Sequence, residues 1–194
     1  MITADAPPMR LKRKRWKRVE YEKMVASGVL KEDDKLELVE GELFEKMTLN
    51  PPHAVVMMKL QRLLSRRLPD GYEARNQLPL AMSRISEPEP DFAIVAGTPD
   101  DYGRQHPMTA LLLIEVAESS LAYDRVKKGN MYAKAGIPDY WIVNINERVV
   151  EVYRDPTKVN GRGRWQTQFR VEEGETVTPL HFEKMSIAVS DILP

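Results

Sequence analysis

Hydrophobic residues recur at helical spacing in three stretches of the chain. The clearest is residues 53–68, where apolar side chains return every third or fourth position and predict a helix with one buried face. A shorter pattern over residues 16–25 stops near Gly28 and predicts an amphipathic helix. A third helix is predicted over residues 123–135, because Gly136 and the proline that follows it form a helix-stop signal.

Short apolar or alternating segments between these helices predict strands. Residues 91–95 and 111–117 are apolar enough to lie inside a sheet. The Glu40-Gly41 pair, between two alternating segments, indicates a β-hairpin over residues 35–47. Further strands are predicted at residues 72–82, 140–144, 149–153, 165–171 and 176–180, with an exposed turn at 158–164. This order predicts an α/β (α+β) fold in which helices flank a central mixed β-sheet, with an N-terminal helix and hairpin and extra C-terminal strands.

Length and composition indicate one folded domain. The chain has 194 residues, 42% of them hydrophobic and 30% charged, as in ordinary globular proteins. We expect residues 1–15 to form a flexible basic arm and residues 16–194 to form a single domain. The start has no signal-peptide core, and no apolar run reaches the ~20 residues that a membrane span needs. We therefore expect a cytoplasmic protein with no membrane partner.

Cysteine content and charge narrow the chemistry. The chain has no cysteine, which excludes thiolate zinc sites and cysteine nucleophiles and leaves oxygen or imidazole ligands. Its 29 basic and 29 acidic residues balance, so net charge gives no argument for a polyanionic partner. Seven of the nine residues 10–18 are basic, and this run either contacts phosphates or solvates the terminus. The candidate nucleic-acid contacts are Arg13, Arg15, Lys59 and Arg62.

Two acidic residues stand in apolar surroundings. Asp91 precedes Phe-Ala-Ile-Val, and Glu115 lies inside Leu-Leu-Leu-Ile-Glu-Val-Ala. A carboxylate in such a strand must be paired, protonated or bound to metal, because burying an isolated charge is costly. If the two strands are neighbours, the carboxylates converge on a hard-oxygen site suited to magnesium. The alternative is that Asp91 caps a strand entrance and Glu115 pairs with a basic residue.

Other polar residues are candidates for the same site. Asp124 and Lys128 are four residues apart and share a helix face, where they form either an ordinary salt bridge or an arrangement in which Lys128 points toward Glu115. His53, at a helix start, is either an auxiliary ligand, a phosphate contact or a partly exposed helix-start residue. The acids of the hairpin alternate with leucines, so most should face solvent while one reaches the site, and Glu42 is the candidate.

Several fragments, taken in their order, resemble a protein family. They are Leu36-Glu-Leu-Val-Glu-Gly-Glu42, His53, Glu89-Pro-Asp91, Ile114-Glu-Val-Ala-Glu-Ser-Ser120, Asp124 with Lys128, Tyr132 and Gly136-Ile-Pro-Asp-Tyr-Trp141. Each fragment alone is unspecific, but their joint order resembles the Uma-two family of restriction-endonuclease-like proteins from roughly Trp16 to Pro156. The resemblance implies the PD-(D/E)xK nuclease fold.

The resemblance also implies an activity, that of a metal-dependent endonuclease acting on nucleic acid, with DNA as the expected substrate. Asp91 and Glu115 would bind magnesium, for which manganese can substitute. The general superfamily pattern has a lysine two positions after the glutamate, where this chain has Ala117. The resemblance implies that Lys128 replaces it as the catalytic lysine, although Lys127 is adjacent and remains an alternative.

Glu42, His53 and Asp124 would then be auxiliary residues of the site. Two rival interpretations stay open: a catalytically inactive nucleic-acid-binding or regulatory module on the same fold, and an interaction protein whose acids are merely paired. Cutting both strands of a duplex needs two sites or two events, so a homodimer is compatible with the predicted activity.

Overall fold

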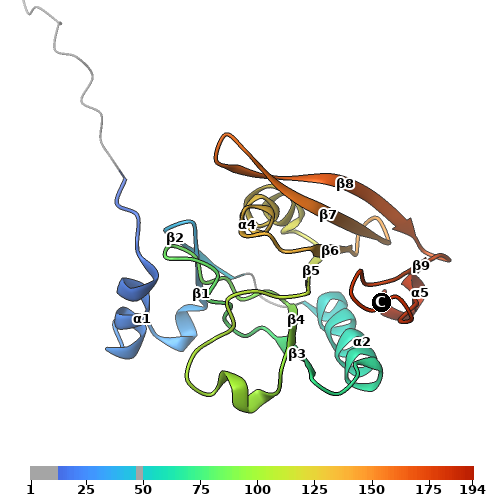
Figure 1. Ribbon diagram of the computed structural model, residues 1–194, viewed down its shortest axis with the longest axis horizontal. Coiled ribbons are helices and arrows are strands. Elements are labelled where there is room, and N and C mark those ends of the chain that lie inside the picture. The colour runs from blue at the N-terminus through green and yellow to red at the C-terminus, as the bar shows by residue number, and fades with distance from the viewer. Residues whose placement is uncertain (1–12, 47–49) are drawn as a thin grey trace, which may run out of the picture.

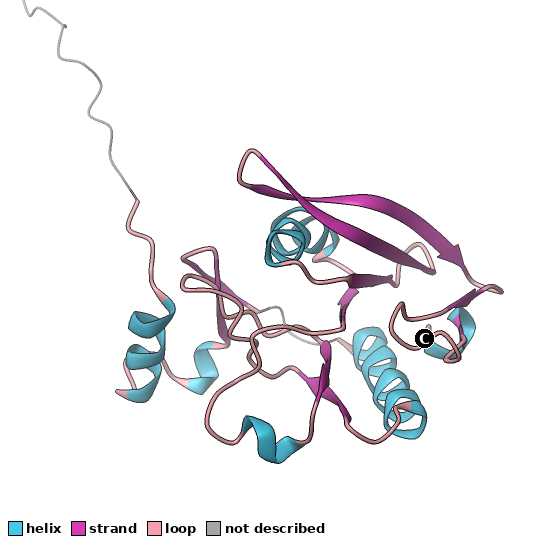
Figure 2. Cartoon of the chain, viewed as in Figure 1, coloured by secondary structure: helices cyan, strands magenta, loops and turns pink. Residues whose placement is uncertain are grey.

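A six-stranded sheet forms the centre of the computed structural model, which describes residues 13–46 and 50–194. Its strands, in spatial order, are β3 (Tyr72–Asn76), β4 (Phe92–Ala96), β5 (Leu112–Ala117), β6 (Asp139–Asn144), β7 (Val149–Val159) and β8 (Arg162–Glu172). Strands β5 and β6 are parallel and all other neighbours are antiparallel. The predicted mixed sheet flanked by helices is confirmed (Figures 1 and 2).

Smaller elements surround this sheet. The helices are α1 (Arg18–Ala26), α2 (Pro51–Arg67), α3 (Leu121–Tyr123), the π-helical turn η3 (Asp124–Lys128), α4 (Gly129–Ala135) and α5 (Val189–Ile192). Short 3-10 turns are η1 (Glu32–Asp34) and η2 (Pro99–Tyr102), and two small hairpins pair β1 (Leu36–Val39) with β2 (Glu42–Glu45) and β9 (Thr176–Val177) with β10 (Ile187–Ala188). None of the helices in the described ranges has the length and apolar character that crossing a bilayer requires.

The alternation of side chains along β5 divides the core into two layers. Ile114 and Val116 pack with α2, whereas Leu113 and Ala117 pack with α4 on the other face. Figure 1 shows α2 and α4 on opposite sides of β5 and β6. Because successive residues of a strand point to opposite faces, Glu115 must face the layer that contains α4.

Helix α2 begins two residues earlier than the pattern predicts. Asn50 caps it, since its side chain accepts a hydrogen bond from the His53 backbone N–H at 3.1 Å. Two prolines follow at positions where a helix needs no backbone donor. His53 is therefore held in the first turn of α2.

The predicted strand at residues 72–82 is wrong in its second half. Strand β3 ends at Asn76, because Gln77 has a φ of 50°, outside the strand region. The chain then crosses to the first hairpin, where the Glu87 N–H donates to the Leu38 carbonyl at 2.7 Å. Leu80 and Met82 of this segment pack with Leu113 and Ala117, so the segment covers the sheet face that carries Glu115.

The predicted turn at residues 158–164 is too long, and so is the predicted strand at 176–180. Strands β7 and β8 continue to a turn of only Asn160 and Gly161, both with positive φ, as in a tight hairpin. This hairpin lies close to α4: a Cβ atom on Gly163 would be 2.0 Å from the Asn130 carbonyl oxygen. At the chain's end, β9 is only Thr176–Val177.

The helix predicted at residues 123–135 starts at Leu121 and contains a π turn. The Gly129 N–H donates to the Asp124 carbonyl, five residues back. The Tyr140 hydroxyl donates to the same carbonyl at 3.1 Å. Such single π turns often occur at functional sites. Here the turn places both Asp124 and Lys128 among buried residues.

Candidate active site

Asp91, directly before β4, and Glu115, inside β5, lie side by side. Phe92 pairs with Ile114, so the next step of the register sets Asp91 opposite Glu115. The Asp91 carboxylate accepts a hydrogen bond from the Val116 backbone N–H at 2.8 Å. Both side chains are buried, with Glu115 only 3% exposed. The structure thus brings together the two acids on which the sequence argument depends.

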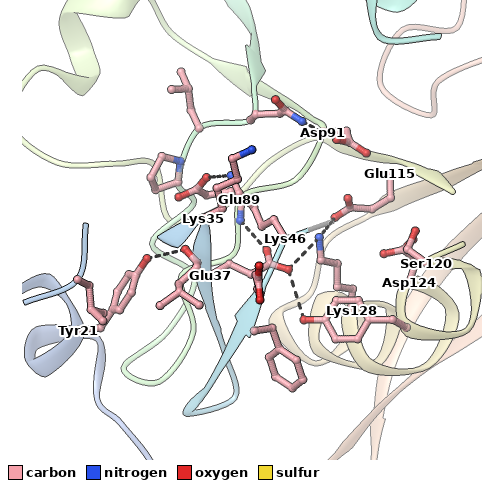
Figure 3. A pocket seen from close by; sticks show the side chains of 18 of the residues that line it. Tyr21, Lys35, Glu37, Lys46, Glu89, Asp91, Glu115, Ser120, Asp124 and Lys128 are labelled. Carbon is pink, nitrogen blue, oxygen red and sulfur yellow. Dashed lines mark hydrogen bonds and ion pairs between the residues drawn. The ribbon is translucent and has the colours of Figure 1, made fainter. Parts of the chain in front are cut away.

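Lys128 points toward Glu115 and not toward Asp124. Its Nζ donates to Glu115 Oε1 at 3.1 Å and lies 3.2 Å from Glu37 Oε1 (Figure 3). Asp124 instead accepts a hydrogen bond from the Ser120 hydroxyl at 2.5 Å. The sequence left two arrangements open for Lys128, a salt bridge with Asp124 or a contact with Glu115. The structure has the contact with Glu115.

The neighbouring lysine is directed elsewhere. Lys127 Nζ donates to Glu42 Oε2 at 2.7 Å in a half-buried ion pair. Glu42 is therefore not the hairpin acid that contacts Lys128, and its auxiliary role stays a prediction. Its place is taken by Glu37, which is 2% exposed.

Glu37 is held by contacts from three segments. Besides Lys128, it accepts hydrogen bonds from the Glu89 backbone N–H at 3.0 Å and from the Tyr123 hydroxyl at 3.3 Å. Alternation along β1 shows that Glu37 and Leu38 face opposite sides, but it does not show that both sides are covered. That covering comes from packing with segments distant in sequence, which no local pattern signals.

His53 lies beside Asp91. Its Nε2 is 3.4 Å from Asp91 Oδ1. The His53 Nε2 atom is buried and has no hydrogen-bond partner among the residues that the structure describes. Gln77, which the sequence argument did not single out, donates to the same Asp91 oxygen at 3.1 Å. His53 thus lies next to Asp91, and its auxiliary role stays a prediction.

An open cleft of about 950 Å³ gives access to these side chains. Asp91, Glu115, Asp124 and Lys128 line one wall, and residues of α1 and the first hairpin line the other, including the lysines Lys35 and Lys46 (Figure 3). Buried polar groups that converge on a cleft are typical of a ligand or substrate site.

Comparisons with known proteins agree with this fold. A family model named Uma2 and described as "Putative restriction endonuclease" matches residues 18–190. This chain belongs to the Uma2 family. The match confirms the resemblance seen in the sequence fragments and extends it through the β7–β8 hairpin to the C-terminal segment.

Solved structures show the same fold for this Uma2 protein. One, titled as a "putative nuclease belonging to DUF820" from Anabaena variabilis, superposes with a TM-score of 0.69 and 17% sequence identity, covering 90% of this chain and 95% of that chain. At this identity the likeness concerns the fold alone. A search of curated proteins finds no match.

The site of this Uma2 protein has more acids than cations. Burial raises the pKa of Glu115 well above its usual range although Lys128 lowers it, and burial likewise raises the pKa of Asp124 to about 6. Burial also acts to raise the pKa of Asp91, but the His53 ring and Lys128 outweigh it, so this pKa is lowered. Lys128 keeps its proton, because the surrounding acids raise its pKa more than burial lowers it.

The donor set of this site fits a magnesium ion. Within residues 13–46 and 50–194, no three His, Asp or Glu side chains form a group that could hold a metal ion by themselves. Magnesium is commonly held by one or two carboxylates with water completing the shell. Asp91 and Glu115 supply such oxygens, and the unpartnered His53 Nε2 beside them is a buried polar atom that a hydrated ion would satisfy.

Tyr132 orients Glu115. Its buried hydroxyl donates to Glu115 Oε1 at 2.6 Å, the oxygen that Lys128 also contacts. Burial raises the pKa of Tyr132 well above its usual range, so the hydroxyl remains a donor. Lys128 and Tyr132 therefore both hold the Oε1 atom of Glu115, from the same helical segment. From the sequence, Tyr132 was one of the fragments that resemble the family, with no role assigned to it.

We predict that Tyr132→Phe lowers the free energy of unfolding by about 1.5–3 kcal/mol, because a bond to a charged acceptor is lost. The control is Tyr140→Phe, which removes a hydroxyl bonded to a neutral carbonyl and should cost about 1 kcal/mol. Urea denaturation of both variants measures the difference. Equal losses would contradict the special role of the Glu115 contact.

The four predicted nucleic-acid contacts are not among the residues that line the cleft. Arg15 donates to the Glu40 carbonyl at 2.5 Å, and Lys59 donates to the Leu193 carbonyl. Arg13 and Arg62 are exposed. The part of the basic arm before Arg13 lies outside the described residues. These contacts remain predictions.

Proposed function

We propose that this Uma2 protein is a magnesium-dependent endonuclease that hydrolyses phosphodiester bonds of DNA. The observation that carries the proposal is the group of four buried carboxylates around one ammonium at the wall of an open cleft; they are Glu37, Asp91, Glu115 and Asp124 around Lys128. Such an excess of buried negative charge favours uptake of a cation. The description of the family as restriction endonucleases supports DNA as the substrate.

In this proposal Asp91 and Glu115 hold the metal. When bound, magnesium, or manganese in its place, supplies Lewis-acid stabilisation of the phosphate charge. Tyr132 and Lys128 hold Glu115 through its Oε1 atom, and Glu115 lines the cleft. The His53 ring and the Val116 N–H hold the Asp91 carboxylate in its deprotonated form.

Lys128 acts as a charge and a hydrogen-bond donor, not as a base. Its raised pKa keeps the ammonium protonated at neutral pH, so it cannot accept a proton from water. Positioned beside Glu115, it stabilises the negative charge that develops on the phosphate oxygens and orients the attacking water. Asp124, buried in the same helical segment, supports the positive charge of Lys128.

Cleavage of labelled single- and double-stranded DNA and RNA, with magnesium or manganese, tests the proposal. We expect metal-dependent cutting of DNA by the wild type, reduced at least about 100-fold in Asp91→Ala and Glu115→Ala. Glu45→Ala is the matched control, since Glu45 lines the same cleft but is exposed. Absence of cutting on every substrate, together with DNA binding that needs no metal, would favour a non-catalytic binding module.

A further inference from the structure

We propose that Arg75 and His106 form a second site, which binds a phosphate group of a DNA strand beside the candidate active site. The identification of the strand as DNA rests on the proposed function. The proposal itself stands on the position, the hydrogen bonding and the charge of these two side chains.

Arg75 lies on the same face of the sheet as the acids. It pairs with Ala93, and Asp91 is two residues from Ala93 along the strand direction. From strand spacing, the Cα atoms of Arg75 and Asp91 are roughly 8 Å apart. Arg75 also donates to the carbonyl of Pro79, a residue of the cleft wall, at 3.4 Å. A DNA strand bound in the cleft would therefore pass close to Arg75.

The guanidinium of Arg75 has unused donors and no acidic partner. Its Nη2 donates to Pro79 and lies 3.2 Å from His106 Nδ1, whereas its Nε is buried without a partner. In the described part of the chain, no carboxylate lies within 4.0 Å of it. The half-buried Arg154, by contrast, donates to Asp139 at 2.9 Å. A partly desolvated cation without a counter-charge is costly unless a ligand supplies the charge.

His106 is an exposed residue and adds a further donor to the pair. A guanidinium can only donate, so the Nδ1 atom of His106 accepts and its proton resides on Nε2. Burial and the charge of Arg75 both lower the pKa of His106, which keeps the ring in this neutral form. Tyr102 lies under the guanidinium, with its ring centre 5.4 Å from the Arg75 Cζ.

The free groups of this pair are consequently all donors. Phosphate oxygens only accept, and arginine binds them well because its planar fork can donate two hydrogen bonds in parallel. The same set of donors offers nothing to a cation. A nucleic-acid phosphate next to the scissile one is the ligand that this chemistry and position fit.

Binding of a fluorescein-labelled single-stranded DNA to the full chain, in EDTA and over a series of salt concentrations, tests the site. We expect Arg75→Gln to weaken binding about threefold to tenfold and to reduce the slope of log affinity against log salt by about 1. Arg104→Gln is the control, because Arg104 is an exposed arginine of the loop that carries His106. Equal binding by the wild type and both variants would overturn the proposal.

Two further variants separate binding from folding. Arg75→Lys keeps the charge without the fork, so it should restore the salt slope but not the full affinity. His106→Gln changes an exposed side chain and should weaken binding about twofold even if Arg75→Gln fails to fold. Unchanged affinity in His106→Gln would count against the site. The binding assay contains EDTA and so does not depend on cleavage. A protein that binds DNA through Arg75 but never cuts it would therefore disprove the proposed nuclease activity and leave the phosphate site standing.

Discussion

Lys128→Met will lower the free energy of unfolding by about 3–5 kcal/mol at pH 7.5, the cost of leaving buried charges unpaired. Lys128 is 6% exposed and forms the ion pairs that the structure gives Glu115 and Glu37. Methionine fills similar space but offers these acids no charge. Thermal and urea denaturation measure the loss.

Lys127→Met is the matched control. It removes an ion pair with Glu42 at the half-exposed surface, which is worth about 0–1 kcal/mol. We also expect Lys127→Met to retain nuclease activity and Lys128→Met to lose it, which decides between the two adjacent lysines. Similar stability losses in both variants would contradict the described placement of Lys128.

The cost of Lys128→Met should depend on pH. Burial raises the pKa of Glu115, and that of Asp124 to about 6, while Lys128 lowers both. Without the ammonium both pKa values rise further, so protonation at pH 5 relieves the unpaired charge. The gap in stability between variant and wild type should thus be smaller at pH 5 than at pH 7.5. A gap that is constant with pH would contradict the electrostatic origin of the loss.

Glu115→Gln will abolish metal-dependent cleavage, by at least about 100-fold, and yet make the metal-free protein more stable at pH 8. Glutamine keeps an oxygen that can accept from Tyr132 and Lys128 but removes a buried charge. We expect the free energy of unfolding to rise by about 1–2 kcal/mol, which is typical when a functional residue is replaced at the cost of activity. For a chain of this length that raises the melting temperature by roughly 2–4 °C per kcal/mol.

The sign of this effect follows from the raised pKa of Glu115. A carboxyl whose pKa is higher in the folded state stabilises that state while protonated, and this stabilisation is lost as pH rises through the folded pKa. At pH 8 the buried charge of Glu115 destabilises the wild type, whereas Glu115→Gln carries no such charge. Glu45→Gln, at an exposed position of the same cleft, should change neither stability nor cleavage. A Glu115→Gln variant that is less stable at every pH would refute the account.

The sequence alone determined the larger elements and the two strand acids. Periodicity located α2 and the apolar strands, since a side chain's face on a helix or strand depends only on its spacing. Asp91 and Glu115 were found for the same reason, because an acid among apolar strand residues stands out without any knowledge of its neighbours. The family resemblance added the fold and the preference for Lys128.

Only the tertiary structure decided which groups meet at the site. Three features lay beyond the local pattern: Glu37 and not Glu42 reaches the cluster, Tyr132 holds Glu115, and a π turn buries Lys128. Arg75 also looked like an ordinary strand residue until its lack of an acidic partner was seen. Spacing along a chain defines the face on which a side chain lies, but what covers that face depends on segments far away in sequence.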